Sequence, residues 1–136
     1  MRIFLVESQP EWLRELQSAA EGIDRILVTA ETPEEAMQKI QSEDFDLIIT
    51  NLSLDPRNDD IKGMEILQHT RMKDPDIPVI IVTHYASQTR STKAIEEGAF
   101  DFIDRASAGM DHKLMLQHKI KYALELRALR LAVHSK

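Results

Sequence analysis

The sequence predicts an α/β domain in which a parallel sheet carries helices on both faces. Short apolar runs alternate about five times with longer segments of helical periodicity. The runs are almost continuously hydrophobic, which is typical of parallel strands buried on both faces. At 136 residues, the chain has the length of one domain with a sizeable core.

Each predicted strand is a short apolar run that stops at a polar residue. The clearest is the PVIIV run at residues 78–82, which Thr83 follows. The five predicted strands cover residues 2–6, 25–29, 47–50, 78–82 and 100–103. Strands that alternate with helices in this way pair in parallel through right-handed crossovers.

The helical segments begin at recognisable capping or turn residues. Pro10 suits a first helical turn, because its missing N–H would have no partner there, and Trp12 is expected on the buried face of that helix. Thr32 and Glu35 lie three residues apart, which is the signature of a capping box. The predicted helices begin near Pro10, Pro33, Gly63, Ser87 and Met110, and the last one continues to His134.

Charge and composition exclude several classes of function. The formal net charge is −6, from 17 basic and 23 acidic residues. The chain therefore lacks the excess of positive charge that is typical of nucleic-acid-binding domains. The chain has no cysteine, which excludes disulfides, thiolate nucleophiles and cysteine zinc sites. Its four glycines form no GxGxxG or P-loop spacing, which argues against a nucleotide-binding enzyme. The first apolar run is too short for a signal peptide or a membrane span, so we expect a cytoplasmic protein without membrane contact.

Polar residues follow four of the predicted strands. They are Glu7 and Ser8 after the first strand, Asn51 after the third, Thr83 after the fourth and Arg105 after the fifth. If the strands have the order 2-1-3-4-5 of flavodoxin-like sheets, these residues meet at the carboxyl edge, where such sheets bind their ligands.

Four segments around these residues resemble the receiver domain of two-component response regulators. They are VESQP, DLIITNLSL, PVIIVT and EEGAFDFIDR. The resemblance covers residues 1–125 and implies a flavodoxin-like, doubly wound sheet of order 2-1-3-4-5 with five helices on its two faces. Residues 126–136 are expected to extend the last helix and could link it to a downstream domain.

The resemblance assigns each strand-end residue to a position in the phosphorylation site of the family. Working receivers have two adjacent acids, a phospho-accepting Asp, a Ser or Thr, and a Lys at these positions. The acids hold magnesium, the Asp is the nucleophile, and the hydroxyl and ammonium groups bind the phosphoryl group. In this chain the positions are occupied by Glu7 and Ser8, Asn51, Thr83 and Arg105.

Two of these substitutions remove chemistry that phosphorylation needs. Asn51 has no carboxylate to attack phosphorus, and Ser8 replaces the acid that binds the metal most directly. Glu7 alone remains as a charged metal ligand, so we expect weak or absent magnesium binding, no other cofactor and no enzyme activity. Arg105 is expected to reach Glu7 or the Asn51 carbonyl. The resulting hypothesis is a pseudo-receiver with a degenerate phosphorylation pocket.

Two other interpretations of the pocket stay open. The loop after Asn51 is longer than is usual in the family, and its Asp55 could be a displaced phospho-acceptor, although a solvated polar loop is the preferred explanation because the proline and the charges need no ligand to account for them. Alternatively, Thr83 and Arg105 could hold a small anion in the vacated pocket, as in a ligand sensor.

Without phosphotransfer, the expected function is contact with a protein partner, either a downstream output domain or a cognate signalling protein. Working receivers dock and dimerise through the fourth helix, the fifth strand and the fifth helix. The candidate interaction residues are His84, Ser87, Lys93, Leu116, Ile120, Leu124 and Leu131. Phe102 matches the switch aromatic of the family, with a buried core ring as the alternative. The apolar last helix permits a homodimer, or a helix that frays in solvent.

Overall fold

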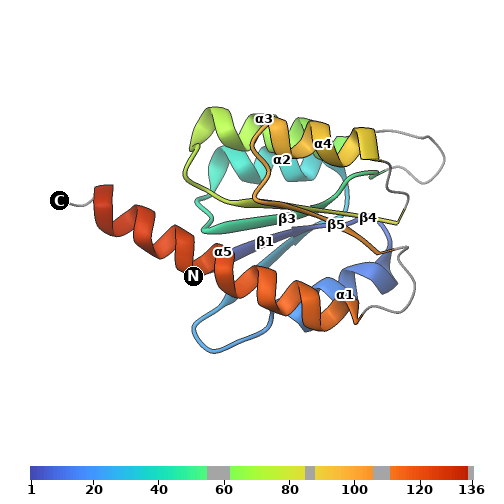
Figure 1. Ribbon diagram of the computed structural model, residues 1–136, viewed down its shortest axis with the longest axis horizontal. Helices are drawn as coiled ribbons and strands as arrows, with labels where there is room; N and C mark the ends of the chain where they lie inside the picture. Colours follow the sequence, from blue (N-terminus) through green and yellow to red (C-terminus); the bar gives the residue numbers. More distant parts are fainter. Residues whose placement is uncertain (55–61, 85–87, 106–110, 135–136) are drawn as a thin grey trace.

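The computed structural model describes residues 1–54, 62–84, 88–105 and 111–134, in which strands and helices alternate (Figure 1). The strands are β1 (Arg2–Val6), β2 (Ile26–Ala30), β3 (Leu47–Asn51), β4 (Val79–Thr83) and β5 (Asp101–Asp104). The helices are α1 (Pro10–Ala20), α2 (Pro33–Ser42), α3 (Lys62–Lys73), α4 (Gln88–Glu96) and α5 (His112–His134). Neighbouring strands pair in parallel in the order β2-β1-β3-β4-β5. The predicted flavodoxin-like fold is therefore confirmed.

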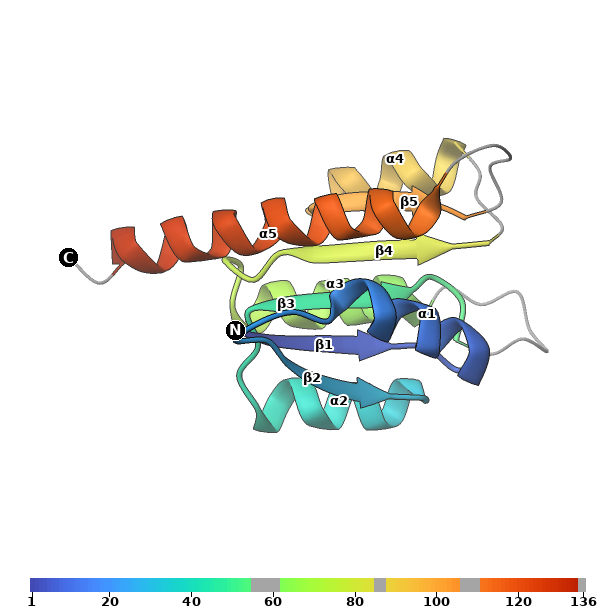
Figure 2. The ribbon, with the colours of Figure 1, turned by 90° about the horizontal axis from the view of Figure 1, so that it is seen from below.

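Alternate side chains of the central strands supply two hydrophobic layers. Phe4 and Ile48 pack in the layer that includes residues of α2, α3 and α4. Ile3 and Ile49 pack in the layer that includes residues of α1 and α5. Figures 1 and 2 show these two groups of helices on opposite faces of the sheet. Because both faces are covered, the carboxyl edge is where loops and strand-end side chains meet.

The ends of the elements follow the sequence prediction closely, with one difference in capping. Thr32 Oγ1 accepts a hydrogen bond from the Glu35 amide at 3.1 Å, as expected of an N-cap. The Glu35 carboxylate accepts from the Glu31 amide at 3.4 Å, so the capping box does not close on Thr32 itself. The helix starts predicted near Ser87 and Met110 fall outside the described residues.

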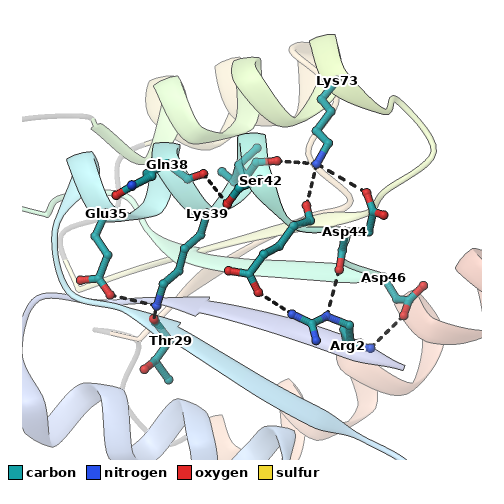
Figure 3. A network of polar contacts seen from close by, with 11 residues as sticks. Arg2, Thr29, Glu35, Gln38, Lys39, Ser42, Asp44, Asp46 and Lys73 are labelled. Carbon is teal, nitrogen blue, oxygen red and sulfur yellow. Dashed lines mark hydrogen bonds and ion pairs between the residues drawn. The ribbon is translucent and has the colours of Figure 1, made fainter.

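A polar network joins β1, α2 and α3 at the amino edge of the sheet (Figure 3). Arg2 donates to the Glu43 carboxylate at 2.6 Å and to the Asp44 carbonyl at 3.1 Å. Lys73 donates to the Ile40 and Glu43 carbonyls at 2.5 and 2.6 Å. These two carbonyls lie at the end of α2, where a helix leaves its last carbonyls without intrahelical partners. The network therefore fixes the edge opposite to the strand ends that carry the candidate site.

The first half of α5 belongs to the core. Leu116, Ile120 and Leu124 are at most 9% exposed and pack with α1 beneath the sheet. The prediction that these three residues form an interaction face is therefore wrong. An apolar helix stripe packs on the sheet because this removes it from water within the same chain.

Charged side chains hold the second half of α5 across the amino edge. Arg127, which is 8% exposed, lies 3.3 Å from both the Asp46 and the Asp74 carboxylates. Arg130 donates to the Asp76 carbonyl at 2.9 Å. These contacts hold the second half of α5 against the domain. The sequence alone had left open whether this part of the helix frays in solvent. No helix in the described ranges has both the length and the hydrophobicity that crossing a membrane requires.

Candidate functional site

Three of the strand-end residues converge at the carboxyl edge, because β1, β3 and β4 are neighbours in the sheet. Glu7, Asn51 and Thr83 are 2%, 3% and 2% exposed. Arg105 follows β5, and its amide donates to the Thr83 carbonyl at 2.7 Å. The sheet order thus brings together residues that lie far apart in the sequence.

Glu7 and Asn51 are joined by a short, buried hydrogen bond. Asn51 Nδ2 donates to Glu7 Oε1 at 2.6 Å. The second carboxylate oxygen, Oε2, accepts from the amides of Ser8 at 2.7 Å and Gln9 at 3.4 Å. Asn51 Oδ1 in turn accepts from the Ser53 amide at 3.2 Å. Both carboxylate oxygens and both polar atoms of the amide therefore have partners within the chain.

Burial raises the pKa of Glu7 above its ordinary value of 4.5. The hydrogen bonds from Asn51 and from the Gln9 and Ser8 amides, and the positive charge of Arg105, act in the opposite direction and lower this pKa. The net effect is a raised pKa of Glu7. Burying even this one carboxylate in the pocket therefore costs desolvation free energy. A second carboxylate at the Asn51 position would add like-charge repulsion to that cost.

Arg105 does not contact Glu7 or the Asn51 carbonyl, so that expectation is wrong. Its guanidinium forms an ion pair with Glu15 on α1, and its side chain is 12% exposed. The Glu7 carboxylate already has three donors, whereas Glu15 offers a free carboxylate within reach of the long Arg105 side chain. The strand-end position therefore directs a positive charge toward α1.

A stacked pair that the sequence did not predict lies beside the pocket. The ring centroids of Trp12 and His84 are 3.3 Å apart and their planes differ by 13°. Trp12 is half-buried through this contact rather than a core residue like its neighbour Leu13. Two sequence features could have predicted this pair. Trp12 lies in the first turn of α1, at the carboxyl edge of the sheet, and His84 directly follows β4.

Burial, reinforced by the positive charge of Arg105, lowers the pKa of His84 from 6.5 to about 4. The imidazole is therefore neutral at physiological pH and stacks on the indole without a charge to hydrate. This neutral pair fixes the start of the β4 to α4 connection against α1.

The remaining predicted site residues are more scattered. Phe102 is half-buried and packs against the hydrophobic layer beneath α2, α3 and α4. Lys93 and Leu131 are exposed, as an interaction face requires. Ser87 and Asp55 lie outside the described residues, so their proposed roles stay predictions. Within the described ranges, no three His, Cys, Asp or Glu residues gather as a metal site would require.

The family follows from comparison with known proteins. A family model for the response regulator receiver domain matches residues 3–116 of the chain. This chain belongs to that family. Receiver domains are signalling modules of two-component systems, so the chain is a signalling domain of this type.

Three similar proteins illustrate the range of the match. The response regulator protein PilR of Pseudomonas aeruginosa is 29% identical over 105 residues, which are 76% of this chain and 22% of PilR. The chain thus spans only about a fifth of the length of such curated relatives. A CheY-like receiver domain of Methanospirillum hungatei has a TM-score of 0.80 at 26% identity, covering 95% of this chain and 97% of its own. The beryllofluoride-activated NtrC4 receiver domain dimer has a TM-score of 0.78 at 25% identity, covering 93% and 98%.

The Glu7 to Asn51 contact predicts the effect of restoring an acid. The Asn51→Asp variant replaces the donor by a second carboxylate beside the buried Glu7 carboxylate. In EDTA at pH 7, we expect its free energy of unfolding to fall by about 2–3 kcal/mol. The loss should shrink on acidification, since one shared proton can then join the two carboxyl groups. Urea denaturation at several pH values measures both effects.

The control for this variant is Gln117→Glu, which makes the same change from amide to carboxylate at an exposed site on α5. It should leave stability nearly unchanged. An Asn51→Asp protein as stable as the parent at pH 7 would contradict the proposed arrangement.

The stacked pair can be observed directly, because Trp12 is the one tryptophan in the chain. A charged imidazolium quenches indole emission more than a neutral imidazole does. In the folded protein, emission should therefore fall with a midpoint near pH 4, the pKa of His84, and not near 6.5. The depressed pKa also means that stability present above pH 6.5 is lost as the pH falls toward 4. Fluorescence titration, with circular dichroism to verify folding, measures the midpoint.

Two variants assign this transition. His84→Gln should abolish it, whereas His69→Gln, an exposed position on α3, should retain it. A midpoint near 6.5, or a transition that survives in His84→Gln, would show that the pair does not form as described.

Proposed function

We propose that this chain is a receiver domain that signals without being phosphorylated, through contact with a protein partner. The observation that carries the proposal is the buried hydrogen bond between Glu7 and Asn51. Asn51 stands where working receivers have the phospho-accepting Asp, and an amide nitrogen that donates to a carboxylate has no electron pair to offer phosphorus. The receiver scaffold then supplies a docking surface, and the proposal contains no catalytic step.

The set of oxygen atoms in the pocket also does not suit a magnesium ion. Magnesium requires near-octahedral oxygen coordination and gives up its water reluctantly. Glu7 is the single carboxylate among the strand-end positions of β1 and β3, and both of its oxygens already accept hydrogen bonds. We therefore infer that magnesium binding is weak or absent and that the hydrogen bonds from the Asn51 side chain and from the Ser8 and Gln9 amides stabilise the Glu7 carboxylate instead.

The proposed partner is either an output domain of the same protein or a cognate signalling protein. PilR, the relative described above, is a response regulator of which this chain matches about a fifth of the length. We propose that residues 1–125 form the receiver and that residues 126–136 lead from it as a linker.

The second half of α5 is the proposed contact surface for a homodimer or a downstream helix. Leu129, Leu131 and Val133 are 66%, 43% and 66% exposed. The NtrC4 receiver has a described dimer, which supports self-association as one use of this scaffold. With Leu116, Ile120 and Leu124 buried, the contact surface moves toward the end of the helix and the exposed Lys93 side of α4.

Acetyl phosphate tests the proposal most simply. The protein is incubated with acetyl phosphate and magnesium, and its intact mass is measured beside that of a working receiver. We expect no added mass. An addition of about 80 Da, the mass of a phosphoryl group, would overturn the proposal. If that addition disappeared in Asp55→Asn and persisted in Asn51→Ala, Asp55 would be the phospho-acceptor.

A further inference from the structure

One side of α5 carries apolar side chains at the spacing of a coiled-coil seam. The seam consists of Tyr122, Leu126, Leu129 and Val133, which follow one another at intervals of four, three and four residues. Alternating intervals of three and four residues separate the a and d positions of a heptad, which face the partner helix. Tyr122, Leu129 and Val133 are 57%, 66% and 66% exposed, and Leu126 is half-buried. The seam is therefore largely open to solvent.

A different side of the same helix packs on the domain. Ile120, Ala123 and Leu124 belong to the core beneath the sheet. Arg127 extends this buried side to the amino edge, where its guanidinium lies between two carboxylates. At 100° per residue, the buried side is centred about 140° around the helix from the seam. Figures 1 and 2 show the second half of α5 projecting beyond the amino ends of the strands, so a second helix can lie along it.

Two charged residues beside the seam indicate which helix fits it. With Leu126 at an a position and Leu129 at a d position, Glu125 is at g and Arg130 is at the next e. In a parallel pair of helices, each g position lies next to the following e position of the other helix, and opposite charges there set the orientation. Glu125 forms no ion pair with another residue of the described ranges. Arg130 donates to the Asp76 carbonyl through Nη1, and a guanidinium has further donors for a carboxylate.

We propose that this chain forms a parallel homodimer through α5, in which two copies of the seam pack together and Glu125 of each copy pairs with Arg130 of the other. The two-fold symmetry of such a dimer forms each ion pair twice. In an antiparallel dimer with the same seam, Glu125 would lie beside Ala132 and Arg130 beside Ala123. Alanine carries no charge, so the parallel orientation is the one that pairs both charged residues.

This inference rests on the proposed function, because it names a second copy of the chain as the partner in signalling by contact. The dimer needs no phosphoryl group, so it is measured in a buffer without magnesium or a phosphoryl donor. Added mass with acetyl phosphate would overturn signalling without phosphorylation and leave the dimer standing. A protein that stays monomeric would overturn the dimer and leave the absence of phosphorylation standing. The two failures are therefore distinguishable.

Sedimentation equilibrium at protein concentrations from about 10 µM to about 1 mM tests the proposal. The seam is short, so we expect a weak dimer with a dissociation constant of about 100 µM. The average mass should rise with concentration from the monomer mass of 15.6 kDa toward twice that value. Leu129→Lys should weaken the dimer by at least about tenfold, because it places a charge in the seam. Met72→Lys, which changes an exposed apolar residue on α3, should leave it unchanged. A constant monomer mass, or a dimer that Leu129→Lys retains, would overturn the proposal.

An exchange of charges tests the parallel orientation. Glu125→Lys and Arg130→Glu each place like charges opposite one another, so each variant alone should dimerise more weakly than the natural sequence. In an equal mixture, the two variants form a heterodimer in which both pairs again have opposite charges. The mixture should therefore associate about tenfold more tightly than either variant alone. Circular dichroism verifies folding, since Arg130→Glu also loses the bond to the Asp76 carbonyl. A mixture that associates no more tightly than its components would overturn the parallel arrangement.

Discussion

The buried hydrogen bond between Glu7 and Asn51 is the contact on which the rest of the carboxyl edge depends. A lone carboxylate at 2% exposure is tolerated because the Asn51 amide and two backbone amides surround it with donors. With those donors in place, we infer that the carboxylate needs no cation. The side chains buried at the carboxyl edge are therefore neutral or have partners within the chain. A cluster of acids at the same place would need a metal ion to relieve the repulsion between the carboxylates.

The side chains next to this hydrogen bond connect the strand ends to α1. Arg105, which has no unsatisfied carboxylate to meet at the strand ends, pairs with Glu15 on α1. Its charge and the burial of the ring keep His84 neutral, and the neutral ring stacks on Trp12. Helix α1 is thus tied to the ends of both β4 and β5.

At the opposite edge of the sheet, Arg127 joins α5 to Asp46 and Asp74. Polar contacts thus hold both ends of the α1 and α5 layer.

The sequence predicted the features that follow from periodicity and from sheet order. Continuous apolar runs such as residues 78–82 located the strands, and parallel pairing brought Glu7, Asn51 and Thr83 together. The contacts of Arg105 were not predictable in the same way, because a long side chain reaches several carboxylates and its choice depends on which one is already satisfied. Leu116, Ile120 and Leu124 have the spacing of a helix stripe that packs on a sheet, and the error was to include them in the interaction face as well.

If the strand-end pocket is complete without a metal, as we propose, magnesium should not change the thermal stability of the protein. Thermal unfolding is measured in EDTA and in excess magnesium chloride at equal ionic strength. The double variant Ser8→Asp with Asn51→Asp restores the acids and should gain a magnesium-dependent rise of several degrees, which proves the sensitivity of the assay. We expect the natural sequence to have the same melting temperature in both buffers. A rise of several degrees with magnesium in the natural sequence would contradict it.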